Sequence, residues 1–243
     1  MKYFLTSSPS VSMDGAINPT NGFFENLTKA LKKPVRAVFV TTYPDDIGFS
    51  DHCSVCMRKA FEEAGLMFDS YTLLDRRTAP HVAEIIADSN FLILGGGHVP
   101  SQNAFLNELG MKKLLKNYDG VVLGISAGSM NAANIVYSQP EEPGEATDKD
   151  FKRFVPGLGI TDVKILPHYY LCKDMKVDGL KVYEDIAMPD SITSQSRFYV
   201  FPDGTYLYGD NGNETIYGEF YIIENGVMRK VANEGQQMGL PVV

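Results

Sequence analysis

The feature that most constrains the fold is an alternation of short apolar runs with helical patterns through about the first 135 residues. The segment 35–43 contains a near-continuous apolar run, which is typical of a strand buried on both faces. Other strand-like runs follow along the chain and alternate with helix-like segments, among them residues 101–117 and 127–136. Strands that alternate with helices predict a mostly parallel, doubly wound α/β sheet with helices on both faces.

The pattern changes after about residue 138. Residues 138–161 are polar and rich in proline and glycine, which predicts a long loop, and loops of this length are often functional. A short strand is expected at 163–170 and a helix at 175–188. The end of the chain is β-rich, with tight turns at Pro-Asp-Gly and Glu-Asn-Gly. Because no linker or repeat divides the sequence, we expect residues 1–243 to form a single α/β domain.

Charge and cysteine content exclude several classes of partner. The 243 residues carry a formal net charge of −8 and contain no basic block, which argues against nucleic acid and acidic membrane surfaces. Three cysteines are an odd number, which argues against a disulfide framework and indicates a reducing compartment. The apolar runs are too short for a signal peptide or a membrane span. We therefore expect a cytoplasmic protein.

Ser126 lies in the sequence Leu-Gly-Ile-Ser-Ala-Gly-Ser, between Gly124 and Gly128. A strand is expected before it and a helix after it, which is the context of a nucleophile elbow. The glycines leave room for a strained turn that lifts the serine above the sheet. The N–H groups at the start of the helix can then stabilise an oxyanion. A serine that only caps the helix is the alternative. The strand–turn–helix context favours the nucleophile.

A glycine triplet, residues 95–97, ends the preceding strand. Its backbone N–H groups can face an anion or an oxyanion. The segment lacks the Lys-Ser/Thr pair of a phosphate-binding P-loop and the spaced glycines of a dinucleotide fingerprint. A tight turn that requires positive φ explains the triplet equally well when it is taken alone. Its place one βα unit before Ser126 favours the oxyanion role.

A serine nucleophile needs a general base, usually a histidine that a carboxylate orients. His52 and His81 lie on expected surface helices, and His98 adjoins the glycine turn, where it contacts substrate or is incidental. His168 ends the apolar run at 163–170 and is the preferred base. The carboxylate is expected in the 138–161 loop, where spacing alone does not choose among Glu141, Glu142, Glu145, Asp148 and Asp150.

These motifs resemble the peptidase E family of serine peptidases, which are relatives of cyanophycinase. The likeness rests on Ile-Leu-Gly-Gly-Gly, on Gly-Ile-Ser-Ala-Gly-Ser, on Leu-Pro-His and on the β-rich C-terminal part. It implies one hydrolytic α/β domain, with a fold like that of class I glutamine amidotransferases and serine in place of their cysteine. By this resemblance Ser126 matches the nucleophile, His168 the histidine and Glu141 the acid, where family members often have aspartate.

The resemblance also implies how the substrate is held. Gly96 or Gly97 and Ala127 match the backbone donors of the oxyanion site, with His98 beside them. Neither a metal nor another cofactor is implied. Family peptidases act on short peptides, classically dipeptides that begin with aspartate.

Aspartyl-specific members of this family carry an arginine in the segment after the histidine. This chain has Lys173, Lys176 and Lys181 there and no arginine until Arg197. Lysine does not give a carboxylate the planar, bidentate pairing that arginine gives. We therefore expect a short-peptide hydrolase whose preferred N-terminal residue need not be aspartate.

Two other functions stay open: an esterase that uses the same triad, and a non-catalytic protein of the same fold that binds a small molecule. The Cys-x-x-Cys spacing at Cys53 and Cys56 has no second pair, so neither a metal nor a redox site is expected. Residues 209–215 lack the full calcium-loop pattern and predict a hairpin turn. The expected partner is a small peptide, and a homodimer is left open.

Overall fold

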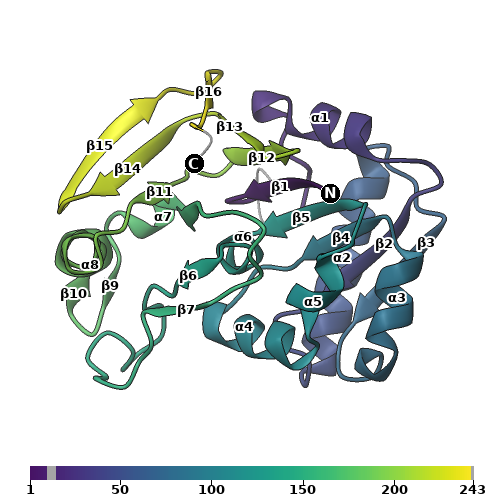
Figure 1. The fold of residues 1–243 in the computed structure, drawn as a ribbon, viewed down its shortest axis with the longest axis horizontal. Coiled ribbons are helices and arrows are strands. Elements are labelled where there is room, and N and C mark those ends of the chain that lie inside the picture. Colours follow the sequence, from purple (N-terminus) through teal and green to yellow (C-terminus); the bar gives the residue numbers. More distant parts are fainter. Residues whose placement is uncertain (10–14, 242–243) are drawn as a thin grey trace.

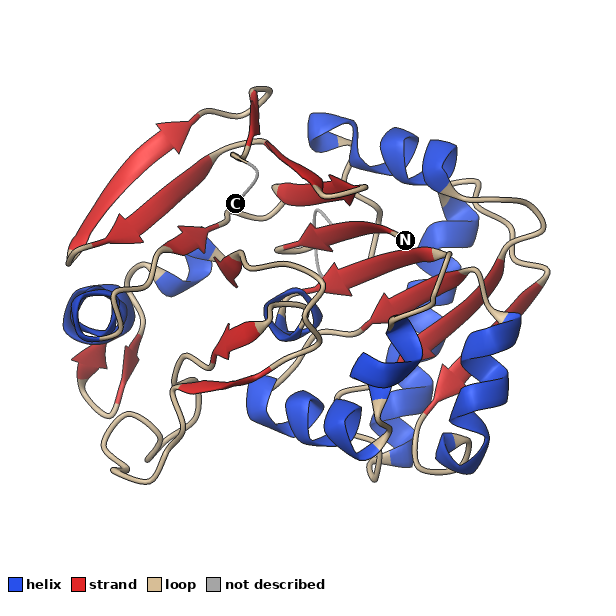
Figure 2. Ribbon diagram, viewed as in Figure 1, coloured by secondary structure: helices blue, strands red, loops and turns tan. Residues whose placement is uncertain are grey.

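The computed structural model describes residues 1–9 and 15–241, and in this part of the chain eight strands form the main sheet (Figures 1 and 2). Their order across the sheet is β16 (Gln237–Gly239), β13 (Asn213–Tyr217), β12 (Tyr206–Asp210), β1 (Lys2–Thr6), β5 (Val121–Ile125), β4 (Phe91–Leu94), β2 (Arg36–Val40) and β3 (Ser70–Leu74). Neighbouring strands among β1, β5, β4, β2 and β3 pair in parallel. Strands β12, β13 and β16 extend the sheet beyond β1 with antiparallel pairing. The predicted, mostly parallel α/β sheet is confirmed.

Side chains of the central strands alternate between two apolar cores. In β4, Phe91 and Ile93 belong to one core, and Leu92 and Leu94 belong to the other. Helices α1 (Phe23–Ala30) and α2 (Ile47–Glu63) contribute to the first core, and α3 (Val82–Asp88), α4 (Val99–Glu108) and α5 (Met111–Leu115) contribute to the second. Short 3₁₀ turns, η1 (Thr20–Gly22) and η2 (Ala79–His81), precede α1 and α3. Burial on both faces explains why these strands are apolar throughout.

Two expected helices are shorter in the structure. The helical pattern at 101–117 forms α4 and α5, which are separated at Gly110, because this residue adopts a left-handed φ of 64° that ends a helix. The pattern at 127–136 forms only α6 (Ala127–Asn131) before the chain enters β6 (Ile135–Tyr137).

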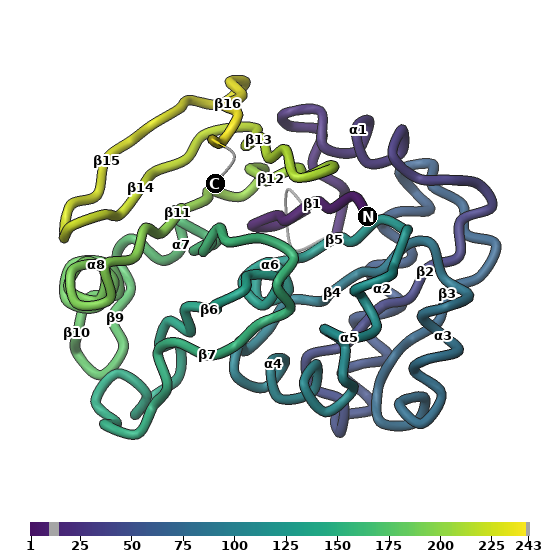
Figure 3. Tube along the Cα trace, in the orientation of Figure 1, coloured from purple at the N-terminus to yellow at the C-terminus, as the bar shows by residue number. Residues whose placement is uncertain are grey.

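The C-terminal half adds a second sheet in the order β15 (Val227–Ala232), β14 (Phe220–Glu224), β11 (Phe198–Val200) and β8 (Lys164–Leu166). Strands β8 and β11 are parallel, and Leu166 lies opposite Val200. Strand β7 (Phe154–Pro156) pairs with β6. Residues 138–153 connect these two strands, and the part from residue 139 to 153, here called the 139–153 loop, extends away from the main sheet (Figure 3).

The helix expected at 175–188 is wrong in its first half. The chain forms a short hairpin of β9 (Lys176–Val177) and β10 (Leu180–Lys181), followed by a π-helical turn η3 (Val182–Ala187) and α8 (Met188–Thr193). Asp178 and Gly179 have φ of 52° and 83°, the pair of positive angles that Asp-Gly hairpin turns use. The apolar spacing suggested a helix, but the Asp-Gly turn determines the local structure.

The hairpin expected at 209–215 is present, with Asn211 and Gly212 at φ of 51° and 80° between β12 and β13. All three cysteines are free thiols. Among the helices of the described residues, none combines the length and the apolar character that crossing a membrane requires.

Candidate active site

Ser126 lies at the turn from β5 into α6, with φ of 50° and ψ of −111°. This backbone conformation is costly for a residue that has a side chain, and such strain is concentrated at functional sites. A Cβ at Gly124 would lie 2.8 Å from the Ser129 nitrogen, and one at Gly128 would lie 2.3 Å from the Leu94 carbonyl oxygen. The strained turn therefore requires both glycines of the motif.

His168 brings its imidazole to the Ser126 hydroxyl, and Nε2 lies 2.9 Å from Oγ. The histidine follows β8 and short helix α7 (Tyr169–Cys172) begins directly after it. Its own backbone is left-handed, with φ of 58°. The structure thus unites two residues that the sequence analysis selected, in the geometry of a nucleophile and its general base.

The second ring nitrogen of His168, Nδ1, lies 2.7 Å from Oδ1 of Asp203. Burial alone would raise the pKa of Asp203, but hydrogen bonds from His168 and from the Ser7 hydroxyl outweigh it and hold this pKa below its usual range. The carboxylate that contacts the histidine in the structure is therefore Asp203 and not Glu141, which the family resemblance implied as the acid.

The sequence analysis did not point to Asp203, because the carboxylate was expected in the loop between Ser126 and His168. The sequence carried a usable signal, the Pro-Asp-Gly turn directly after the strand that becomes β11. Since β11 runs parallel to β8 with Val200 opposite Leu166, residues just past both strands meet at one edge. That parallel pairing joins distant parts of the chain, and nothing local in the sequence predicts it.

Glu141 lies in the 139–153 loop, and its carboxylate makes no hydrogen bond to the described residues, although its backbone N–H donates to Glu145 Oε2 at 2.8 Å. The side chain reaches solvent, yet protein surrounds the carboxylate closely enough that reduced solvation raises its pKa to about 7. The charge of His98 opposes this rise, Glu145 adds to it, and His168 also opposes it. His168 therefore influences the charge of Glu141, whereas the carboxylate that contacts the ring of His168 is Asp203.

His98 anchors the 139–153 loop to the start of α4. Its Nε2 lies 2.7 Å from Glu145 Oε1, and its Nδ1 lies 2.8 Å from Ser101 Oγ. The other Glu145 oxygen accepts the N–H groups of Glu141 and Glu142. Burial would raise the pKa of Glu145, but these hydrogen bonds lower it overall. Both ring nitrogens of His98 are thus engaged within the protein.

One group within the described ranges has metal-ligand spacing: His98, Glu142 and Glu145 offer atoms within 4.8 Å of one another. The histidine and Glu145 already satisfy each other by a hydrogen bond, and Glu145 also accepts two backbone N–H groups. These hydrogen bonds explain why the three side chains lie together: they connect the start of α4 to the 139–153 loop.

The predicted oxyanion glycines border the nucleophile. A Cβ at Gly96 would lie 3.4 Å from the Ser126 Cβ, and one at Gly97, where φ is 133°, would lie 2.9 Å from Thr42. The Thr42 hydroxyl donates to the Gly96 carbonyl at 2.7 Å and fixes this turn. Within residues 1–9 and 15–241, no backbone hydrogen bond uses the N–H groups of Gly96, Gly97 or Ala127. These donors face no competitor for an oxyanion.

The lysines after His168 are surface residues. Lys173 lies 3.6 Å from Asp174, and Lys181 lies 3.5 Å from Glu184, so each of these cations has an acidic neighbour. Lys176 is exposed on β9. His52 and His81 are exposed on α2 and at the end of η2, as expected.

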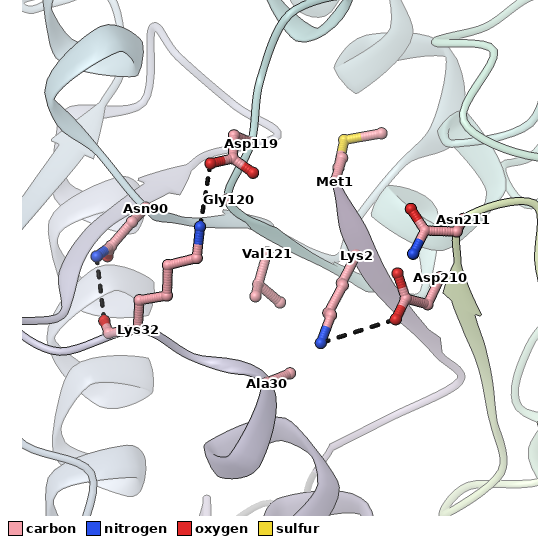
Figure 4. Close-up of a pocket in the computed structure, with 10 residues that line it drawn as sticks. All are labelled: Met1, Lys2, Ala30, Lys32, Asn90, Asp119, Gly120, Val121, Asp210 and Asn211. Atoms are coloured by element: carbon pink, nitrogen blue, oxygen red, sulfur yellow. Dashed lines mark hydrogen bonds and ion pairs between the residues drawn. The ribbon is translucent and has the colours of Figure 1, made fainter.

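A surface hollow shown in Figure 4 lies at the opposite end of the sheet from Ser126. It is lined by Lys2 and Val121, the first residues of β1 and β5, whereas Ser126 follows the last residue of β5. Its charges pair with one another, Lys32 with Asp119 at 3.0 Å and Lys2 with Asp210 at 3.7 Å. This hollow is separate from the Ser126 site.

A serine with a strained backbone that is hydrogen-bonded to a histidine, at the carboxyl ends of parallel strands, is the arrangement of a serine hydrolase. The chain belongs to peptidase family S51, whose family model matches residues 3–216. It is therefore a serine-type peptidase.

Solved structures share the fold. A peptidase from an acI-B1 Actinobacterium matches with a TM-score of 0.69 and 17% identity, over 98% of this chain and 96% of that one. A putative peptidase E protein from Listeria monocytogenes EGD-e matches with a TM-score of 0.56 and 16% identity, over 95% of this chain and 98% of that one. None of the curated proteins matches this sequence.

Proposed function

We propose that this peptidase hydrolyses short peptides, with Ser126 as nucleophile, His168 as general base and Asp203 as the carboxylate that orients the base. The observation that carries the proposal is the continuous contact from Ser126 Oγ to His168 Nε2 at 2.9 Å and from His168 Nδ1 to Asp203 at 2.7 Å. The alignment supports proton transfer from the hydroxyl to the imidazole while Asp203 stabilises the resulting imidazolium.

In the first half of the reaction, Ser126 Oγ bonds to the scissile carbonyl carbon as its proton passes to His168 Nε2. The negative oxygen that forms lies against the N–H groups of Ala127 and of Gly96 or Gly97, which are its proposed donors. The tetrahedral intermediate then collapses, the C–N bond breaks, and His168 gives its proton to the departing amine. An acyl-serine remains.

In the second half, water takes the place of the departed amine. His168 removes a proton from the water as its oxygen bonds to the acyl carbon, and the same N–H groups hold the new oxyanion. The ester bond to Ser126 then breaks, and the serine regains its proton from His168. The cycle consumes one water and needs no metal or other cofactor, and the single domain of residues 1–243 supplies every group.

Short substrates are the proposed class because the family resemblance implies them, and one solved neighbour is described as a putative peptidase E. The acidic neighbours of Lys173 and Lys181 support a preference that does not depend on an N-terminal aspartate. The three free thiols support a cytoplasmic location.

The test combines Ser126→Ala with a panel of short peptides and aminoacyl p-nitroanilides. The wild-type protein should hydrolyse members of the panel and react covalently with a fluorophosphonate at Ser126, and the variant should do neither. Hydrolysis of esters but of no peptide would favour an esterase. Turnover of nothing, with no labelling of Ser126, would favour a binding protein.

A further inference from the structure

We propose that the Glu141 carboxylate binds the protonated amine at the N-terminus of the peptide and so selects substrates whose N-terminus is free. This inference rests on the proposed peptidase function and deepens it, since it names a group of the substrate and the residue that recognises it. It also gives Glu141 a role that differs from the orientation of His168, which Asp203 performs.

The backbone of Glu141 is fixed on the oxyanion side of the site. Its N–H donates to Glu145 Oε2 at 2.8 Å, and Glu145 Oε1 lies 2.7 Å from the ring of His98. His98 directly follows Gly97, a proposed oxyanion donor. One hydrogen-bonded connection therefore ties the start of the 139–153 loop to the turn that would hold the substrate carbonyl.

The middle of the loop is fixed as well. The Asp178 carboxylate, at the turn of the β9–β10 hairpin, accepts the N–H groups of Gly144 at 2.7 Å and Ala146 at 2.9 Å. Glu141 thus lies on a segment that is held from two sides before any substrate arrives. Preorganisation of this kind lowers the entropy that is lost on binding.

The carboxylate itself is unpaired among the described residues, and the Glu141 backbone is joined through Glu145 to His98 beside the oxyanion turn. Its charge acts on His98 beside the oxyanion turn, on His168 at the nucleophile, and on the thiol of Cys172 in α7. Arg153, the arginine of the same loop, is already held by Asp190 at 3.0 Å and by the Ala146 carbonyl. A carboxylate so placed lacks a cation, which a bound substrate can supply.

The chemistry of a short peptide supplies that cation at the required place. Its N-terminal ammonium is only two bonds from the carbonyl of the first residue, so a carboxylate near Ser126 can reach it when that carbonyl is attacked. The C-terminal carboxylate of the peptide would be repelled from the same position by Glu141, Glu142 and Glu145. The charge pattern therefore favours one direction of binding.

The test uses matched pairs of substrates that differ only at the amine: aminoacyl p-nitroanilides and their N-acetyl forms, which share one leaving group. Wild-type protein should give a kcat/KM at least about tenfold higher for the free amine. Glu141→Gln should remove most of this preference by lowering kcat/KM for the free amine about tenfold while leaving the acetylated substrate unchanged. Asp148→Asn, a neutralised acid of the same loop, is the control and should keep the preference.

Equal losses of kcat/KM on both substrates in Glu141→Gln would overturn the inference, because they would show a role in the chemistry common to both. An unchanged preference would overturn it too. A different outcome would refute the proposed peptidase mechanism itself: wild-type protein hydrolyses neither substrate and also resists fluorophosphonate labelling. A second measurement does not need turnover. An amino acid amide should slow fluorophosphonate labelling of Ser126 in the wild-type protein but not in Glu141→Gln. Equal protection of both proteins would count against the inference.

Discussion

The hydroxyl of Ser7 donates a hydrogen bond to the Asp203 carboxylate, with 2.7 Å between the two oxygens. The same hydroxyl accepts the backbone N–H of His168, also at 2.7 Å. Ser7 directly follows β1 and is fully buried, and its own N–H donates to the Thr205 carbonyl. One side chain thus holds the acid and the base of the proposed triad in register, from a strand that contributes no reacting atom.

Replacing Ser7 by alanine should lower kcat about tenfold with little change in KM, since it loosens the base and acid without touching substrate. It should also raise the pKa of Asp203, because the Ser7 hydrogen bond is one of the interactions that lower it. Asp203 must be ionised to stabilise the imidazolium, so the loss should grow as pH falls. Rates measured from pH 5 to 8 test this. Ser50→Ala, which also removes a buried hydroxyl, is the control and should change stability without changing the pH profile.

Asp203→Asn should reduce kcat by about 10³-fold or more on every substrate, because an amide cannot hold the histidine in the required tautomer or stabilise its charge. Single-substrate kinetics on free and acetylated p-nitroanilides measure this. Glu141→Gln should spare the acetylated series. If Glu141→Gln matched the loss in Asp203→Asn on both series, the acid would be Glu141 and the present assignment would fail.

Gly128→Ala should destabilise the fold by about 3 kcal/mol, because the new Cβ meets backbone that has no room to move. The Leu94 carbonyl oxygen would lie only 2.3 Å from it. Chemical denaturation followed by circular dichroism gives the free energy of unfolding. Gly48→Ala on helix α2, where the nearest atom is 3.9 Å away, should be neutral or slightly stabilising. Equal stability of the two variants would contradict the packing argument.

The preference for a free amine should depend on pH in a bell-shaped way. Glu141 is ionised only above its pKa of about 7, which burial and the neighbouring charges of His98, His168, Glu142 and Glu145 set, with the Cys172 thiol also nearby. The α-amine of the substrate loses its proton above about pH 8. The ratio of kcat/KM for free and acetylated substrates should therefore peak between about pH 7 and 8 and fall at pH 5.5. A ratio that stays flat across this range would count against the ammonium contact.

Local patterns in the sequence predicted much of the fold. The apolar strand Phe91–Leu94 is buried on both faces, so its composition alone indicated a central strand of a covered sheet. The serine elbow was also predictable from local sequence, because Gly124 and Gly128 are required by close contacts within or beside a single turn.

Contacts between distant segments were not predictable in this way. Asp203 meets His168 only because β11 pairs with β8, and no spacing rule connects the two residues along the chain. In the segment 175–188, the apolar spacing favoured a helix and the Asp-Gly pair favoured a turn. The turn formed because most residues of β9 and β10 are exposed, so burial would stabilise a helix there only weakly.

The two hydrogen bonds that the 139–153 loop donates to Asp178 have a consequence for how the substrate preference of such a peptidase can change. The β9–β10 turn lies at the surface, where changes in sequence cost little stability. A substitution there would shift the loop, and with it Glu141, while leaving Ser126, His168 and Asp203 in place. Selection could therefore retune substrate choice from a surface hairpin, without altering any residue that takes part in bond breaking.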